Sequence, residues 1–385
     1  MSLCSRCNSG IPKLLLIRML SSKCKTGASD SSKKIAPLDE VKRFITQCMC
    51  AVGVKEDKAE IFADSLVQAD YRGINSHGVN RLEHYLKDIK DKQCDGNADP
   101  TVAMEAPSTA VVCGNNGFGA VVGKFCMDLA IEKASKTGIG MVVANGSNHF
   151  GVGQIYTVQA MNKGFIGFSF TNTSPVMVPT NAKKVALGTN PLSLAAPGEN
   201  CDGLVVDMST TAVSLGKIEM YRRRKEKIPE GWALNEQGKM ETDPEVAVKA
   251  KRLMPLGHTA SHKGVGLALI VEVCSGLLSD SKYGPNIRTW GQLPAAQADL
   301  GHGFIAINPK NFAPGFEHRL SDLLNSIRKM EPADPKHPVM VPGDYEHSVM
   351  KKIDEQGGII YPKTLLDVID KLVKELGVEP IKFRS

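Results

Sequence analysis

The chain has 385 residues, of which 42% are hydrophobic and 23% are charged, as in a folded protein with a sizeable core. Its formal net charge of +6 is concentrated at one end, because residues 1–29 carry five basic and no acidic residues. The rest is nearly neutral, and its one basic run, RRRKEK at 222–227, is typical of a solvated surface. These features argue against nucleic-acid binding, and no apolar stretch is long enough to span a membrane.

Residues 1–33 form a leader whose composition differs from that of the remaining chain. The leader is basic, rich in serine and poor in acidic residues, and a charge interrupts its apolar patch LLLIRML. This pattern is typical of a mitochondrial transit peptide. The alternative is a disordered N-terminal tail on a cytoplasmic protein.

The ten cysteines predict neither a metal centre nor a disulfide framework. Cys4 and Cys7 form a CxxC pair, but they lie in the leader and have no second Cys or His pair nearby. The others, such as Cys48 and Cys126, are scattered among apolar residues, where a free thiol behaves as a small hydrophobe. We therefore expect no bound metal and a reduced intracellular compartment.

The predicted elements divide the chain into helical ends and an α/β centre. Apolar residues at helical spacing predict helices within 36–71 and over 76–91, the latter with Asn75 or Ser76 as N-cap. Helices are also predicted at 119–138 and 264–280 and, after residue 313, at 321–330, 348–358 and 363–377. Short β-rich runs bounded by Gly, Pro and Asn occur at 109–114, 140–146, 164–173, 184–197, 203–210 and 302–309. The fold class is thus α/β, with a central domain at 113–312 inserted into a helical domain made of 34–112 and 313–385.

The stretch NSHGVNR at 75–81 combines residues that carry chemistry. Adjacent Ser76 and His77 suggest a nucleophile and its base, but neighbours on a helix point about 100° apart, and the chain has no GxSxG motif. His77 and Arg81, at positions i and i+4, would share a helix face that Tyr85 continues. An imidazole exchanges a proton near neutral pH, and a guanidinium grips a carboxylate at two points. The pattern suits a 2-oxo or 2-hydroxy acid site, but taken alone it suits an exposed helix face with a capping serine at least as well.

Three further motifs carry candidate site residues. GSNHFGVG at 146–153 follows an apolar run and places His149 in a ligand loop or a Gly-rich turn. In VVDMSTT at 205–211, Asp207 could orient His77 or serve as a helix N-cap. SHKGVG at 261–266 opens a helix, where Lys263 and backbone N–H groups would suit an anion. No GxGxxG occurs, so a standard Rossmann domain is not predicted.

Taken in order, SHGVNRLEHY, SNHFGVG, GTNPLSLAAP, VVDMS, IPEGWALNEQG, HKGVGLALIVEV and VPGD resemble one family, the type 2 malate/L-lactate dehydrogenases. This group includes sulfolactate dehydrogenase, ureidoglycolate dehydrogenase and Δ1-piperideine-2-carboxylate reductase. The resemblance extends from about residue 36 to about residue 375. It implies a non-Rossmann domain for NAD or NADP, built at 113–312 on a mixed, largely antiparallel sheet. It also implies a homodimer.

The resemblance assigns roles to individual residues. His77 would be the acid/base with Ser76 as its partner, Arg81 would bind the substrate carboxylate, and Tyr85 would line the pocket. His149 lies on the cofactor side and is the acid/base in some members, whereas Asp207 would relay charge or contact the cofactor. The remaining cofactor contacts would be Met208, Ser209, His262, Lys263, Pro342, Gly343 and Asp344. Thr173 lies near a position where some members carry lysine.

The predicted function is NAD(P)-dependent hydride transfer between a small 2-hydroxy acid, of malate or lactate type, and its 2-oxo acid. One alternative is reduction of a cyclic imine such as piperideine-2-carboxylate. Another is a catalytically silent protein that binds metabolites. The sequence does not decide between NAD and NADP, because the acidic residue of the Rossmann motif is missing.

Overall fold

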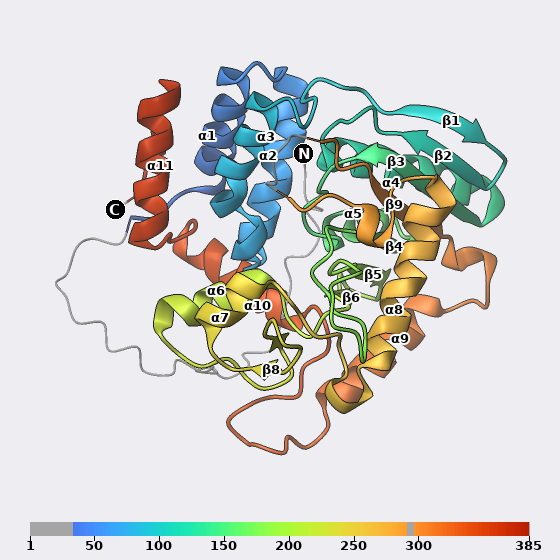
Figure 1. Ribbon diagram of the computed structural model, residues 1–385. Coiled ribbons are helices and arrows are strands. Elements are labelled where there is room, and N and C mark those ends of the chain that lie inside the picture. The colour runs from blue at the N-terminus through green and yellow to red at the C-terminus, as the bar shows by residue number, and fades with distance from the viewer. Residues whose placement is uncertain (1–33, 291–295, 385) are drawn as a thin grey trace.

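The computed structural model describes residues 34–290 and 296–384, and helices from both ends of the chain lie together beside a large sheet (Figure 1). These terminal helices are α1 (Leu38–Ala51), α2 (Glu56–Tyr71), α3 (Leu82–Lys90), α10 (Asp344–Gln356) and α11 (Lys363–Leu376). The last helix, α11, lies beside the first, α1. The predicted leader, residues 1–33, lies outside the described residues.

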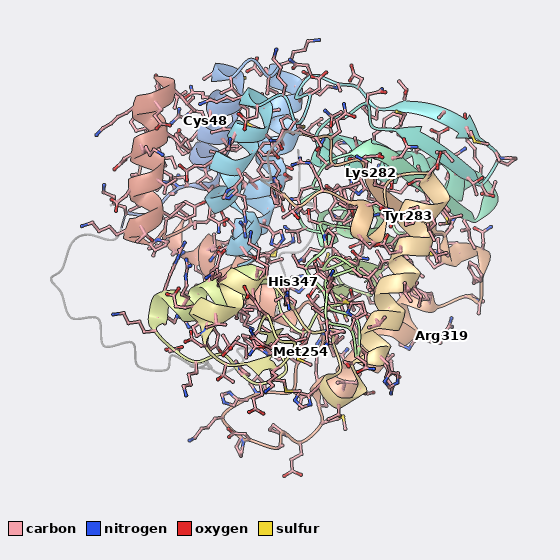
Figure 2. All side chains as sticks on the ribbon, in the orientation of Figure 1. Cys48, Met254, Lys282, Tyr283, Arg319 and His347 are labelled. Atoms are coloured by element: carbon pink, nitrogen blue, oxygen red, sulfur yellow. The ribbon has the colours of Figure 1, made fainter. Side chains whose placement is uncertain are left out.

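One apolar cluster holds this helical layer together. The buried residues of α1 recur at helical spacing and are Val41, Phe44, Ile45, Cys48 and Met49. Ile369 and Leu372 of α11 belong to the same cluster. Cys48 lies inside the layer (Figure 2), and burial raises the pKa of its thiol to about 12, so it packs as the predicted small hydrophobe.

The central sheet has seven strands in the order β1-β2-β3-β9-β4-β5-β6. The strands are β1 (Thr101–Glu105), β2 (Thr109–Cys113), β3 (Ile139–Ser147), β4 (Ile166–Thr171), β5 (Leu192–Pro197), β6 (Gly203–Met208) and β9 (Leu300–Ile307). Only β2 and β3 pair in parallel, and the other five pairings are antiparallel. The prediction of a mixed, largely antiparallel sheet is therefore confirmed.

Helices cover the sheet on both faces. On one face α4 (Gly119–Thr137) and α5 (Gln154–Met161) pack on Phe304 of β9. The neighbouring residue Gly303 points to the other face, where a Cβ would lie only 2.6 Å from the carbonyl oxygen of Cys274. Cys274 belongs to a π-helical turn (Val273–Leu277) that continues α8 (His262–Glu272). Glycine at 303 thus allows this helix to approach the sheet closely.

The remaining elements lie at the edges of these layers. The helices α6 (Leu215–Arg224) and α7 (Pro244–Ala250) pack with a short hairpin, β7 (Ala233–Leu234) and β8 (Met240–Glu241), around a small apolar cluster. Helix α9 (Phe316–Arg328) contacts β6. Within the described residues, no helix has the length and apolarity that a membrane crossing requires.

Two details of the predicted organisation differ from the structure. The strand β1 was not predicted, because all five of its residues are exposed and leave no alternating burial pattern. The sheet therefore begins at residue 101, before the predicted domain boundary at 113, and β2 pairs with β3 along its whole length. The division into two domains stays a prediction.

The continuous helix predicted over 76–91 is wrong. Two 3-10 turns, Asn75–His77 and Val79–Arg81, precede α3 and are separated by Gly78. The N–H of Val79 donates to the side chain of Asp70 at 3.0 Å instead of to a carbonyl of the preceding turn. No side chain caps either turn or α3, so neither Asn75 nor Ser76 is an N-cap.

Candidate active site

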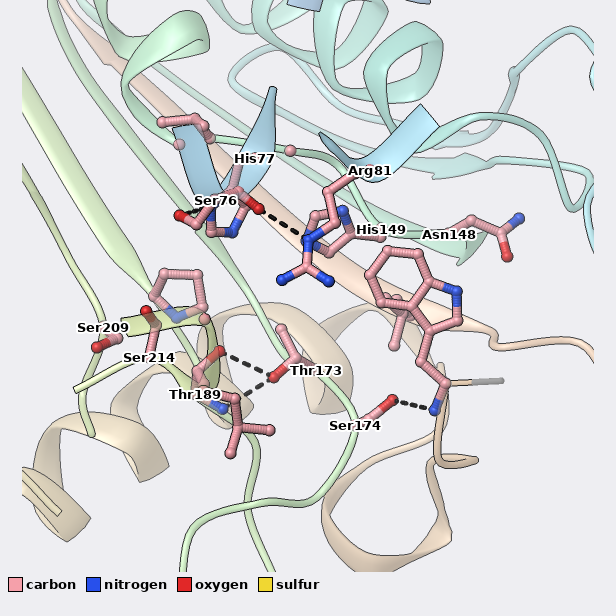
Figure 3. A pocket seen from close by; sticks show the side chains of 18 of the residues that line it. Ser76, His77, Arg81, Asn148, His149, Thr173, Ser174, Thr189, Ser209 and Ser214 are labelled. Carbon is pink, nitrogen blue, oxygen red and sulfur yellow. Dashed lines mark hydrogen bonds between the residues drawn. The ribbon is translucent and has the colours of Figure 1, made fainter. Parts of the chain in front are cut away.

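A cavity of about 480 Å³ lies between the helical layer and the sheet, and Figure 3 shows part of its lining. Its walls come from the 75–81 turns, the loop after β3, the end of β6, the first turn of α6 and the segment 288–290. The predicted site residues in its lining are Ser76, His77, Arg81, Tyr85, His149, Asp207, Met208 and Ser209. Tertiary structure thus brings together residues from three distant parts of the chain.

Ser76 and His77 are hydrogen bonded to each other, with 2.8 Å between Ser76 Oγ and His77 Nδ1. The prediction that they do not face each other is wrong, since the two side chains meet within the 3-10 turn Asn75–His77. The pair still lacks the third group of a nucleophilic triad, since no described carboxylate is hydrogen bonded to His77. Burial and, secondarily, the charge of Arg81 lower the pKa of His77 to about 4, so its imidazole is neutral.

Arg81 presents its guanidinium to the cavity (Figure 3). Its Nε donates to the carbonyl oxygen of Ser76 at 2.8 Å, which fixes the side chain and leaves the two terminal nitrogens facing inward. Gly216, in the first turn of α6, leaves room beside them: a Cβ there would lie 3.5 Å from Arg81 Nη2 and 3.3 Å from Ser76 Cβ. A planar carboxylate can therefore reach the guanidinium at two points.

His149 lies beside His77 in the cavity wall, in the loop after β3, as the sequence predicted. Its Nδ1 lies 2.5 Å from the hydroxyl oxygen of Tyr85. The ring stacks on His77, with centroids 5.6 Å apart, and on Trp290, with centroids 4.8 Å apart. Burial, followed by the nearby His77 and Arg81, lowers the pKa of His149 well below its ordinary value. Two neutral imidazoles thus stand side by side in one cavity.

Trp290 and Arg288 are cavity residues that sequence reasoning missed. Trp290 Nε1 donates to Asp88 Oδ2 at 2.9 Å, and Arg288 Nη1 donates to Gln93 Oε1 at 2.6 Å. Both residues lie in an irregular segment with no local motif. The one available signal was that Trp290 is among only two tryptophans of the chain.

Asp207 is the penultimate residue of β6 and lines the cavity, but it does not orient His77. Its Oδ2 accepts the backbone N–H of Gln154, the first residue of α5, at 2.9 Å, and no hydrogen bond joins Asp207 to His77 among the described residues. It does not cap α6 either, because Ser214 fills that position. Burial raises the pKa of Asp207 to about 7, although the Gln154 bond opposes this shift.

Five predicted cofactor residues lie outside the lining of this cavity. His262 and Lys263 form the first turn of α8, as the helix prediction required. The carbonyl oxygen of Pro342 accepts a hydrogen bond from the N–H of Val205, and Gly343 directly precedes α10. Asp344 forms a salt bridge with Arg328, with 2.7 Å between Asp344 Oδ1 and Arg328 Nη2. Thr173 does line the cavity and bonds to Thr189 Oγ1. Contact of these residues with a cofactor stays a prediction.

A model of the malate/L-lactate dehydrogenase family matches residues 36–370. The chain belongs to this family. It is 37% identical over 366 residues to the malate dehydrogenase of Pyrococcus abyssi, covering 92% of this chain and 99% of that one. It is 36% identical over 339 residues to the L-sulfolactate dehydrogenase of Methanocaldococcus jannaschii, covering 88% and 96%. Its fold matches the structure of malate dehydrogenase from Entamoeba histolytica with a TM-score of 0.85 and 32% identity, covering 90% and 99%.

Membership of the malate/L-lactate dehydrogenase family confirms the resemblance seen in the motifs and makes the protein an NAD(P)-dependent oxidoreductase of 2-hydroxy acids. Relatives are named for either cofactor: the ureidoglycolate dehydrogenase of Escherichia coli, 34% identical, for NAD⁺, and the (2R)-3-sulfolactate dehydrogenase of Chromohalobacter salexigens, 29% identical, for NADP⁺.

Part of the cavity wall is formed by residues with small side chains or none. Gly151 and Gly216 contribute no side chains to its walls, and a Cβ on Gly151 would meet no atom within 4 Å. Ser209 and Ser214, also small, lie at the end of the cavity away from Trp290 (Figure 3).

Proposed function

We propose that the cavity holds a small 2-hydroxy acid with its carboxylate on Arg81 and its C2 oxygen within reach of His77. The observation that carries this proposal is the convergence of a neutral imidazole and an inward-facing guanidinium on one cavity. A cation that binds the carboxylate fixes which carbon faces the imidazole. The substrate tail would extend toward Trp290 and Thr173, which also line the cavity.

His77 would move the proton of the reaction. In oxidation its neutral ring accepts the proton of the C2 hydroxyl, and in reduction it returns a proton to the carbonyl oxygen. The Ser76 hydroxyl on Nδ1 leaves Nε2 as the nitrogen that can face the substrate. When bound, NAD or NADP supplies the hydride acceptor or donor. His149, held by Tyr85 and packed against His77, would complete the wall around the reacting carbon.

We further propose that the cofactor enters from the β6 side in a binding mode that is not of the Rossmann type. Met208 and Ser209 line that part of the cavity, and Asp207 lies beside them. The N-terminus of α8, which no side chain caps, offers His262, Lys263 and its first N–H groups for phosphate, while Pro342, Gly343 and Asp344 would lie along the cofactor. The missing GxGxxG motif supports this arrangement.

The test is oxidation of NADH and of NADPH with malate-, lactate- and sulfolactate-type 2-oxo acids and with the cyclic imine. Turnover of a 2-oxo acid is expected, with its loss in Arg81→Ala. Turnover of the imine alone would replace the proposed substrate class. No turnover with any partner and either cofactor would favour a silent metabolite-binding protein.

We also propose a homodimer formed through α8. The exposed face of this helix and of the π-helical turn is apolar and consists of Leu269, Ile270, Val273 and Leu277, each at least half exposed. Covering such a face with a second copy removes it from water. Light scattering should give twice the chain mass for the native protein and the monomer mass for Ile270→Asp. A monomeric native protein would end this proposal.

The leader supports a proposal on location. The family match begins at residue 36, so residues 1–33 lie outside it and have the composition of a transit peptide. Fused to a fluorescent reporter, residues 1–33 should direct it to mitochondria, and a reporter that stays in the cytoplasm would contradict this.

A further inference from the structure

Asp70 is a buried carboxylate that the proposed mechanism does not use. It lies near the end of α2, is 2% exposed and has no salt-bridge partner among the described residues. Its Oδ2 accepts two hydrogen bonds, from the N–H of Val79 at 3.0 Å and from the hydroxyl of Tyr361 at 2.9 Å. Burial raises its pKa to about 6. A buried carboxylate without a cation costs stability, so its place next to the 75–81 turns requires a reason.

The second oxygen of Asp70 packs against Gly78. A Cβ at residue 78 would lie 1.9 Å from Asp70 Oδ1, a distance that real Cβ atoms do not reach. The backbone of Gly78 has φ of −90°, which lies outside the left-handed region. Contact with the carboxylate is therefore what keeps a side chain out of this position.

The carboxylate joins three segments of the chain. Besides α2 and the 75–81 turns, it holds the C-terminal segment through Tyr361. That segment is fixed in turn, because Ala36 and Ile359 exchange two backbone hydrogen bonds of 2.8 Å. Asp70 contacts the turns at Gly78 and Val79, which lie in sequence between His77 and Arg81, two residues that line the cavity.

We infer that Asp70 is a positioning residue of the active site: it fixes the backbone at Gly78 and Val79 and so sets how His77 and Arg81 are placed relative to each other. This inference rests on the proposed function, in which these two side chains hold different atoms of one substrate. A displacement of about 1 Å between such groups can cost a factor of ~10² in rate. The two 3-10 turns keep Arg81 bonded to the Ser76 carbonyl oxygen, and the Asp70 anchor holds those turns in place.

Steady-state kinetics of the full chain test the inference. Asp70→Ala should lower kcat/KM for the 2-oxo acid by ~10²-fold, through both a lower kcat and a higher KM, while KM for NAD(P)H changes less than ~2-fold. Asp70→Asn should retain most activity, because its carbonyl oxygen can accept both hydrogen bonds. The matched control is Asp64→Ala, an exposed carboxylate on the same helix, which should match the wild type.

Gly78→Ala gives an independent test if Asp70→Ala folds poorly. It should impair the wild-type background by ~10²-fold, since its Cβ displaces the carboxylate, but should cost less than ~3-fold when added to Asp70→Ala. Thermal unfolding of each variant shows whether the fold persists.

The inference is overturned if Asp70→Ala keeps kcat and KM within ~3-fold of the wild type, or if the Asp70 and Gly78 effects simply multiply. It is also overturned if KM for NAD(P)H rises as much as KM for the 2-oxo acid. Failure of the proposed function is distinct from these results, because the wild-type protein would then turn over no 2-oxo acid with either cofactor.

Discussion

The proposed substrate side and the proposed cofactor side differ in where their residues lie relative to the cavity. The substrate side, with Ser76, His77, Arg81 and Tyr85 within ten residues of sequence, lies entirely in the cavity wall. The distant cofactor segments, at 262–263 and 342–344, lie outside that wall. Residues that are close in sequence share a surface through local geometry, whereas distant ones meet only if the whole fold brings them together. Experiments can distinguish the two regions, because substitutions in the first should change KM for the 2-oxo acid and substitutions in the second should change KM for NAD(P)H.

The largest expected effect is on the proton-transfer step. His77→Ala should lower kcat by ~10²–10⁴-fold, the usual scale for a lost general acid or base. His149→Ala should lower it less, because that ring is proposed to complete the wall rather than to carry the proton. Pre-steady-state and steady-state rates of NAD(P)H oxidation measure both. The exposed His318→Ala serves as control, and a larger loss in His149→Ala would reverse the assignment.

The carboxylate grip should give the next largest effect. Arg81→Ala should raise KM for the 2-oxo acid by ~10²-fold, since losing one partner of a shielded charge pair costs a few kcal/mol. Arg81→Lys should recover part of this loss, because an ammonium binds at one point only. KM for NAD(P)H should not change. An equal effect of the exposed Arg319→Ala (Figure 2) would show that the loss is not specific to the cavity.

Filling the space beside Arg81 should have a smaller effect. Gly216→Val places methyl groups where a Cβ already meets Ser76 at 3.3 Å, so KM for the 2-oxo acid should rise roughly tenfold. Lys217→Ala, at the next and exposed position of α6, should leave KM unchanged. Unaltered kinetics in Gly216→Val would place the substrate carboxylate elsewhere.

Variants on the cofactor side should raise KM for NAD(P)H instead of KM for the 2-oxo acid, and by a smaller factor. Lys263→Ala should raise KM for NAD(P)H about three- to tenfold and leave KM for the 2-oxo acid unchanged, because an exposed ammonium that pairs with a phosphate contributes about 1 kcal/mol. His262→Ala should do the same. If only KM for the 2-oxo acid changed, the N-terminus of α8 would have to be assigned to the substrate and not to the cofactor.

The raised pKa of Asp207 should make the stability of the fold depend on pH. Its folded pKa of about 7 lies above the ordinary 3.8, so the native state binds this proton more tightly than the unfolded state. The contribution to stability is therefore fully present below about pH 4 and is lost as the pH rises to 7. Asp207→Asn cannot ionise, so its Tm should fall by a few degrees less between pH 5 and pH 8 than the wild-type Tm. Parallel Tm curves would contradict the buried, protonated carboxylate.

The sequence predicted much of the fold where local periodicity was strong. The helices α1, α2, α4 and α11 and the six strands of the large sheet that have buried residues were predicted, whereas the two-residue strands β7 and β8 were not. The exposed strand β1 carried no such signal. The helix predicted over 76–91 was wrong because Asp70, a residue outside it, accepts the N–H of Val79. Trp290 lay in an irregular segment and gave no pattern at all.

The sequence by itself determined the family, the largely antiparallel sheet and the identity of the side chains that can bind a carboxylate and move a proton. Tertiary structure decided how those side chains meet: it bonded Ser76 to His77, stacked His149 between His77 and Trp290, and turned Asp207 toward α5. The physical reason is that residue chemistry and local spacing can be read from the sequence. The contacts that interrupt a helix or stack two rings involve residues that are far apart in sequence.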